Sequence, residues 1–269
     1  MYLLSLLGGS YVTNLIPQIS RRWIAVWQRI YLAWRKVALG SLMYSTIEPL
    51  LYMVGLGYGL GKLVGELNGL PYIVFVATGS ICFSAYMGAS FEALYSAFAR
   101  MHIQRTWEGI LNAPVSLDDI LFAEWTFAAF KAAMAGTFYL IAMTLMGLVK
   151  TPLALIALPV LFLLGLCAAG IALVVTSQAK SYDSFSYFMT LAVTPMSLLC
   201  DVFLPISQMP TPLQWIANIL PLTHAVAIVR PLITGQWPAN ALLHALVLFC
   251  YAAIGFIIAT RLMRKRILG

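Results

Sequence analysis

Six long apolar segments constrain this chain more than any other feature of its sequence. They lie at residues 38–61, 71–94, 121–148, 153–176, 185–204 and 239–261. A helix needs about 20 apolar residues to cross the hydrocarbon core of a bilayer, and each segment meets that length. Charged residues make up only 9% of the chain, whereas soluble domains carry roughly 25%. We therefore expect an all-α integral membrane protein, in which residues 1–269 form a single transmembrane domain with six spans.

The basic residues predict the orientation of these spans. An even number of spans places both termini on one side, and Lys and Arg concentrate on the cytoplasmic side of membrane proteins. With the termini inside, the cytoplasmic side carries Arg21, Arg22, Arg29, Arg35, Lys36, Arg100, Arg105, Lys180, Arg261, Arg264, Lys265 and Arg266. The outer side carries only Lys62, Lys150 and Arg230. We therefore expect both termini in the cytoplasm, and the net charge of +7 requires no nucleic-acid partner.

The segment at 19–36, before the first span, has the pattern of an amphipathic helix lying in the membrane interface. Apolar residues recur at helical spacing, and the basic residues fall largely at other positions. The apolar positions are Ile19, Trp23, Val26, Trp27, Ile30, Tyr31 and Trp34, and the basic residues at other positions are Arg21, Arg22, Arg29 and Lys36.

The polar stretch at 98–114, between the second and third spans, predicts a second short helix on the cytoplasmic surface. Ile103 and Trp107 belong to one apolar face, and Gln104 and Glu108 form an i,i+4 pair on the other. Physics alone leaves two interpretations open. The helix is either a simple link between spans or a docking element for a cytosolic partner.

Acidic residues follow this stretch at the start of the third span. Asp118 and Asp119 come shortly after Pro114 and before a helical pattern, so we expect them to cap the helix.

The connection before the last span, at 205–232, is predicted to form short re-entrant or interfacial helices on the outer side. Its apolar pieces are too short to span a bilayer, because prolines interrupt them. These prolines are Pro205, Pro210, Pro212, Pro221 and Pro231.

Charges inside the spans are expensive, at roughly 2.5–3.5 kcal/mol each at the bilayer centre. Glu48 and Lys131 lie at similar predicted depths, and we expect them to pair. Glu124, two turns from Lys131, is the rival partner. A structural ion pair and a place on a substrate path both remain open.

The motif GLGYGLG at 55–61 predicts close helix packing, within the chain or across a dimer. It contains two overlapping pairs of glycines four residues apart, Gly55 with Gly59 and Gly57 with Gly61.

The sequence carries no catalytic motif and no clustered metal ligands. The sequence also lacks the acidic or histidine cluster that an integral-membrane transferase would need, so we expect no catalytic residue and no metal site. A stand-alone secondary transporter remains an alternative, although such proteins carry more buried ionisable residues and broken helices in both halves.

Six blocks of sequence together resemble the ABC-2 type (type V) family of ABC-transporter permeases, and the likeness covers essentially the whole chain. The blocks are YLAWRKVALGSL (31–42), GLGYGLG (55–61), FEALYSAFARM (91–101), QRTWEGIL (104–111), SYDSFSYF (181–188) and LPLTHAVAIVRPL (220–232).

This resemblance implies a homodimer in the bacterial inner membrane, bound to two copies of a separate cytosolic ATPase. The ATPase would bind ATP and Mg, and the chain itself would need no cofactor. The substrate would be an amphipathic glycolipid, lipo-oligosaccharide or related saccharide that arrives from the membrane lipid.

The resemblance also implies roles for three groups of residues. A coupling helix that contacts the ATPase would use Arg100, Met101, Gln104, Arg105, Trp107, Glu108 and Leu111. A lateral entrance would be framed by Arg22, Trp23, Trp27, Tyr31, Trp34 and Arg35. An outer gate would include Pro205, Trp215, Pro221, His224 and Arg230.

Overall fold

The computed structural model describes the backbone of residues 17–149 and 151–268, and within these ranges the side chains of 42, 44, 45 and 48 are excluded. The α-helices are α2 Trp23–Trp34, α3 Ala38–Gly59, α4 Gly61–Val64, α5 Tyr72–Phe91, α6 Thr106–Leu111, α7 Leu117–Leu145, α8 Ala157–Gln178, α9 Asp183–Phe188, α10 Thr194–Leu199, α11 Thr211–Ile219, α12 Pro221–Thr234 and α13 Ala241–Ile267. The π-helical segments are η1 Glu92–Ser96, η2 Ala99–Ile103 and η4 Met189–Val193, and the 3-10 segments are η3 Pro152–Ile156 and η5 Ile206–Gln208.

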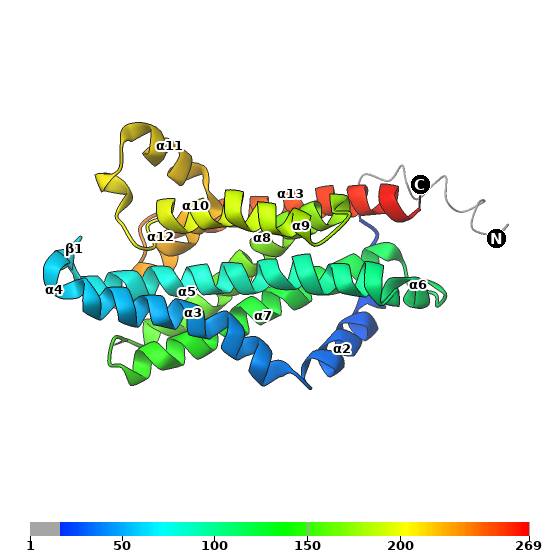
Figure 1. The fold of residues 1–269 in the computed structure, drawn as a ribbon, viewed down its shortest axis with the longest axis horizontal. Helices are drawn as coiled ribbons and strands as arrows, with labels where there is room; N and C mark the ends of the chain where they lie inside the picture. Colours follow the sequence, from blue (N-terminus) through cyan, green and yellow to red (C-terminus); the bar gives the residue numbers. More distant parts are fainter. Residues whose placement is uncertain (1–16, 150, 269) are drawn as a thin grey trace.

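The described part of the chain is a bundle of long apolar helices, which confirms the prediction of an all-α membrane protein. Four helical stretches are long and apolar enough to cross a membrane. They are Tyr72–Ile103, Leu117–Leu145, Pro152–Gln178 and Ala241–Ile267, and each covers one of the predicted spans. Figure 1 shows these helices running along the long axis of the molecule.

The first and fifth predicted spans form helices of a different character. Helix α3 covers the first as 22 residues with Pro49 inside it. The fifth predicted span, 185–204, is shorter than expected, because α9, η4 and α10 together end at Leu199.

The proline-rich connection is broken into short helices, as its sequence predicted. Helices α11 and α12 follow η5 and meet at an angle of 83°. Proline stands at the start of each helix, where its missing N–H costs no hydrogen bond.

A small hairpin between α4 and α5 was not predicted. Strands β1 Glu66–Leu67 and β2 Leu70–Pro71 pair antiparallel around Asn68 and Gly69. Both turn residues have positive φ (52° and 75°), the conformation that an Asn-Gly turn favours. The Asn-Gly pair in the sequence was the signal for it.

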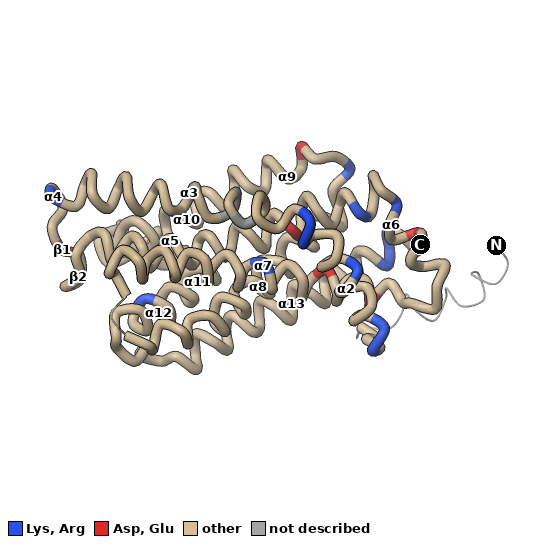
Figure 2. The backbone as a smooth tube through the Cα atoms, turned by 90° about the horizontal axis from the view of Figure 1, so that it is seen from below, with Lys and Arg blue, Asp and Glu red and all other residues tan. Residues whose placement is uncertain are grey.

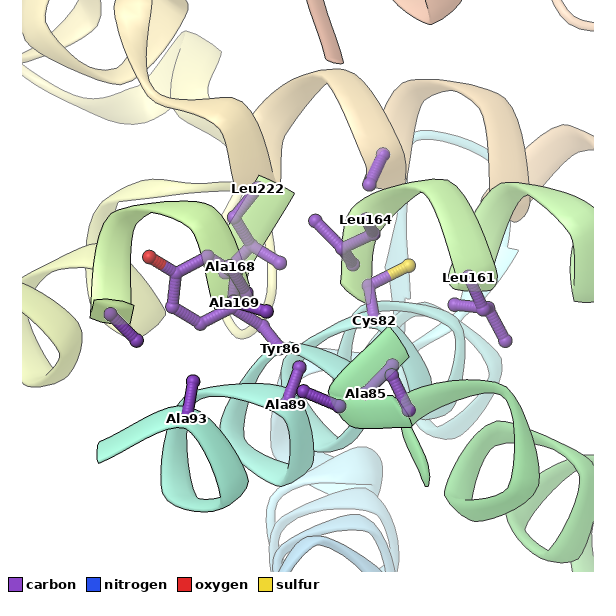
Figure 3. Close-up of a cluster of buried hydrophobic side chains, with 14 of the residues drawn as sticks. Cys82, Ala85, Tyr86, Ala89, Ala93, Leu161, Leu164, Ala168, Ala169 and Leu222 are labelled. Atoms are coloured by element: carbon purple, nitrogen blue, oxygen red, sulfur yellow. The ribbon is translucent and has the colours of Figure 1, made fainter. Parts of the chain in front are cut away.

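Helix α8 lies at the centre of the bundle and packs against α5, α7, α12 and α13. Figure 3 shows alanines of α5 and α8, such as Ala89 and Ala168, in the layer where Tyr86 extends from α5 toward α8. Small residues allow helix backbones to approach closely, which is the main source of packing between helices in lipid.

Glycines outside the predicted motif also allow close helix contacts, and the shortest one to backbone is at Gly79 of α5, where an added Cβ would stand 2.5 Å from Val202. A Cβ built on Gly255 of α13 would stand 3.0 Å from the backbone of Gly170 in α8, so these two helices cross through a pair of glycines. In the GLGYGLG motif, only Gly57 meets a neighbour within the described residues, namely Ile73. The other glycines of the motif have no atom within 4 Å of an added Cβ in this chain.

Candidate functional site at the charged end of the bundle

Charged residues gather at one end of the molecule. Figure 2 shows most Lys and Arg residues near α2, α6 and the C-terminal end of α13, whereas the opposite end, with α4 and the hairpin, carries few. The first and last described residues also lie at the charged end. The Gln18 amide donates to Asp118 (2.7 Å), and Arg264 of α13 pairs with the same carboxylate.

The helix that contains α5 extends to this end and then breaks. It runs without interruption from Tyr72 through η1 and η2 to Ile103. Arg105 then adopts a left-handed conformation with φ 49°, and α6 begins at Thr106. The predicted helix at 98–114 is therefore two pieces, because its first six residues continue the span and only Thr106–Leu111 form a separate helix.

The predicted coupling residues divide into an exposed set and an internal set. Gln104, Arg105 and Glu108 are exposed at the tip around α6, and Leu111 is half-buried. Trp107 points inward and is only 1% exposed, and Met101 is buried as well. The exposed set is open to solvent, whereas Trp107 packs inside the chain.

Arg100 and Trp107 belong to a buried cluster of charges. Arg100 binds Glu124 of α7 (Nε–Oε1 2.8 Å) and Glu92 of η1 (Nη2–Oε1 2.7 Å). The Trp107 indole N–H donates to Glu124 at 3.1 Å. Lys131 of α7 binds the second oxygen of Glu92 at 2.7 Å. We call Glu92, Arg100, Glu124, Lys131 and Trp107 the ionic joint.

The ionic joint adds a partner that the sequence did not predict for the intramembrane charges. Lys131 was expected to pair with Glu48, and the structure shows it bound to Glu92. The Glu48 side chain lies outside the described residues. Glu124, the rival partner of Lys131, binds Arg100 and Trp107 instead.

Sequence reasoning missed Glu92 because it was assigned to the end of a regular helix. In an α-helix, residues eight apart are displaced by about 80° around the axis, so Glu92 and Arg100 were not expected to meet. The balance of charge could have revealed Glu92, because the two buried cations, Arg100 and Lys131, require two buried anions and Glu124 supplies only one.

The start of α7 is capped as predicted, and its acids do more than cap. Ser116 and Asp119 form a capping box, in which each side chain bonds the backbone N–H of the other. Asp119 also accepts hydrogen bonds from the amide and hydroxyl of Ser20. Asp118 forms a buried ion pair with Arg264. The two acids thus join the N-terminal segment, α7 and α13.

Helix α2 forms within the predicted interfacial segment, but its aromatic face covers α7. Trp23 packs edge-to-face on Phe122, and Trp27 packs in the same way on Phe127 (centroids 5.1 and 5.8 Å apart). Trp34 is buried, and Tyr31 is half-buried beside Phe130. Rings held in this way are already occupied by protein, while Arg22 and Arg35 remain exposed.

At the opposite end, Arg230 of α12 forms a further ion pair inside the chain. It pairs with Asp201, donates to Thr78 Oγ1 (3.0 Å) and lies over the ring of Phe75 (3.8 Å). Sequence reasoning named Arg230 but missed Asp201, an acid near the end of the apolar segment predicted as the fifth span.

The other residues of the predicted outer gate lie on both sides of the α11–α12 bend. Pro205 and Pro221 are buried, whereas Trp215 is 71% exposed. His224 contacts His244 of α13, with their Nδ1 atoms 2.8 Å apart.

A cavity of about 310 Å³ lies at the charged end, between α6 and the last turn of α13. Its lining includes Trp107 and Glu108 of α6 and Arg266 of α13. Arg266 also donates to the backbone carbonyls of Thr176 and Ser177 at the end of α8. In the described ranges, no group of three or more His, Cys, Asp or Glu residues is placed to hold a metal ion.

A bundle of helices long and apolar enough to cross a membrane defines a multi-pass membrane protein. Residues 21–234 match the family model described as ABC-2 type transporter. The chain belongs to this family and is an ABC-2 type permease.

The similarity of this chain to its relatives extends over most of its length. It is 42% identical to Nodulation protein J of Rhizobium meliloti (strain 1021) over 94% of this chain and 97% of the relative. It is 43% identical to Nodulation protein J of Bradyrhizobium diazoefficiens over 95% and 97%. The inner membrane transport permease YadH of Escherichia coli (strain K12) is 24% identical over 86% and 95%.

Proposed function

We propose that this chain is the membrane subunit of an ATP-driven exporter in the bacterial inner membrane. Two copies would work with two copies of a cytosolic ATPase, which binds ATP and Mg. The cargo would be an amphipathic glycolipid, a lipo-oligosaccharide or a related saccharide. Membership of the ABC-2 type family and the likeness to Nodulation protein J support this proposal.

The observation that carries the proposal is the arrangement around α6. Gln104, Arg105 and Glu108 are exposed beside this helix, and Trp107 anchors it from within. A short helix that is open to solvent on one face and bonded to α7 on the other suits the docking of a cytosolic motor.

The proposed topology has six spans, with the charged end in the cytoplasm. It counts α3 as the first span and α9–α10 as the fifth, and α11 and α12 re-enter the membrane from outside. The concentration of Lys and Arg at the end that carries α2 and α6 supports this orientation.

The proposed homodimer uses the face of α3. Gly55 and Gly59 have no neighbour within the described residues, and large apolar side chains such as Leu51 and Tyr58 are exposed on this helix. A second copy of the chain would cover this face, with membrane lipid around the rest.

The experiment is purification of the chain from its native membranes in lipid nanodiscs, followed by measurement of ATP hydrolysis with and without added lipo-oligosaccharide. We expect a tightly bound ATPase whose activity the cargo stimulates. Glu108→Lys should weaken binding of the ATPase. Glu66→Lys, the same change at an exposed position on β1 at the other end, should not. Equal behaviour of the two variants would contradict docking at α6.

A further inference from the structure

We propose that the ionic joint makes α6, the inner part of the α5 helix and α7 move as one body, with Glu92, Glu124 and Trp107 as its positioning residues. The inference rests on the proposed docking of an ATPase at α6, and it names the residues that carry the motion into the membrane helices.

The first support is the pairing within the joint. Each carboxylate binds two donors, since Glu92 binds Arg100 and Lys131, and Glu124 binds Arg100 and Trp107. The side chains of Glu92 and Glu124 are only 3% and 2% exposed. Removing one partner from such a group leaves a buried charge without compensation, so the members are held together much more firmly than a surface ion pair. Two anions and two cations also leave the joint neutral overall.

The second support is the local shape of the α5 helix. Residues 92 and 100 would lie about 80° apart around a regular α-helix, but the wider turns of η1 and η2 rotate the chain less per residue and bring them to one side. Thr176 of α8 donates to the Ala93 carbonyl at 2.8 Å, inside η1. π-helical turns are rare and are frequently found at functional sites. Here they serve the pairing of Glu92 with Arg100.

The third support is that α6 depends on the joint for its position. Six residues are too few for a helix to be stable by itself in water. The left-handed residue Arg105 separates α6 from the preceding helix, so the chain does not continue its hydrogen bonds into α6. The bond from Trp107 to Glu124 is therefore the specific link between α6 and α7. A push on α6 passes through Glu124 to Arg100, and from there through Glu92 to Lys131.

The chain offers a matched control for Trp107. Trp125 lies on α7 and, like Trp107 of α6, donates its indole N–H across helices, in this case to the Leu166 carbonyl of α8 at 2.7 Å. Trp125→Phe and Trp107→Phe therefore remove the same kind of bond, and only the second belongs to the joint.

The first experiment measures hydrogen–deuterium exchange of the α6 amides in the full chain in nanodiscs, without ATPase. Trp107→Phe should speed exchange in α6 by roughly tenfold, the loss expected for one hydrogen bond to a charged group. Trp125→Phe should leave α6 unchanged. In the double variant Trp107→Phe with Glu124→Leu, the α6 amides should exchange no faster than in Glu124→Leu alone, because the two changes remove the same bond between Trp107 and Glu124. Unchanged exchange in Trp107→Phe would overturn the proposal.

The second experiment measures cargo transported per ATP hydrolysed by the complex in proteoliposomes. Trp107→Phe and Glu92→Gln should lower this ratio severalfold, whereas Trp125→Phe should keep the wild-type ratio. A wild-type ratio in all three would refute transmission through the joint. If the wild-type chain binds no ATPase, the proposed function fails, and the exchange experiment still decides whether the joint holds α6.

Discussion

The contact between Arg230 and Asp201 gives the most quantitative test of how the helices at the end opposite α6 are held together. The guanidinium binds the carboxylate and the backbone carbonyl of Asp201, the hydroxyl of Thr78 and the carbonyl and ring of Phe75. Arg230→Met removes all of these interactions and leaves a similar apolar volume. The lost cation–π contact costs about 1 kcal/mol, and the Asp201 carbonyl left without this donor costs about 1 kcal/mol more, whereas the Phe75 carbonyl keeps its hydrogen bond from Thr78.

The orphaned carboxylate adds a third contribution. The Asp201 side chain is 22% exposed, so water compensates part of its lost partner, and we assign it about 1 kcal/mol instead of the several expected for full burial. The total destabilisation for Arg230→Met is about 3 kcal/mol. For a chain of this size it corresponds to a fall in Tm of roughly 6–12 °C.

The assay is thermal unfolding in nanodiscs of Arg230→Met, Asp201→Asn and the double variant. The two single changes share one ion pair, so their free energies of unfolding should fall short of additivity by about 1 kcal/mol. Trp215→Ala, at a side chain that is 71% exposed on α11, should change stability by less than about 0.5 kcal/mol. Additive effects of Arg230→Met and Asp201→Asn would refute the reasoning.

Three further changes test the packing and the helix ends. Gly255→Leu should prevent α13 from packing on Gly170 and abolish stable expression. Gly55→Leu, with no atom near its Cβ, should still fold and purify at the size of a monomer. Equal yields of purified protein from the two variants would contradict the glycine crossing. Arg105→Gly should raise stability by about 1 kcal/mol in thermal unfolding, because glycine adopts positive φ without strain, and a loss of stability would show that the arginine side chain matters more than its backbone. Ser116→Ala should lower stability by about 1 kcal/mol through loss of the capping box, and no change in Tm would argue against that cap.

The membrane character of the fold followed from hydropathy, because crossing a bilayer imposes one length and one composition on every helix. The ends of the helices at the charged end of the bundle were predicted less accurately from the sequence. Arg105 takes a left-handed conformation that no propensity predicts for arginine, so the helix of 98–114 became two pieces. The fifth span ended early for a similar reason, since Cys200 leaves the helix and Asp201 turns to meet Arg230.

The candidate site was predicted by location, but only partly by residue role. Periodicity identified Trp107 as part of an apolar face, and the structure confirms that it faces inward. Its bond to Glu124 depends on tertiary contacts, as does the pairing of Lys131 with Glu92. Partners in a charge cluster are chosen by three-dimensional proximity, and π-helical turns alter that proximity in ways that sequence spacing does not record.

The most direct test of the central claim, that an ATPase docks at α6, is photocrosslinking from single positions in native membranes. A benzophenone amino acid placed at Glu108 should form an adduct with a protein that hydrolyses ATP, identified by mass spectrometry and by its activity after purification. The same probe at Trp215, exposed near the opposite end, should give no such adduct. An ATPase adduct from Trp215, or none from Glu108 and Arg105, would contradict the account.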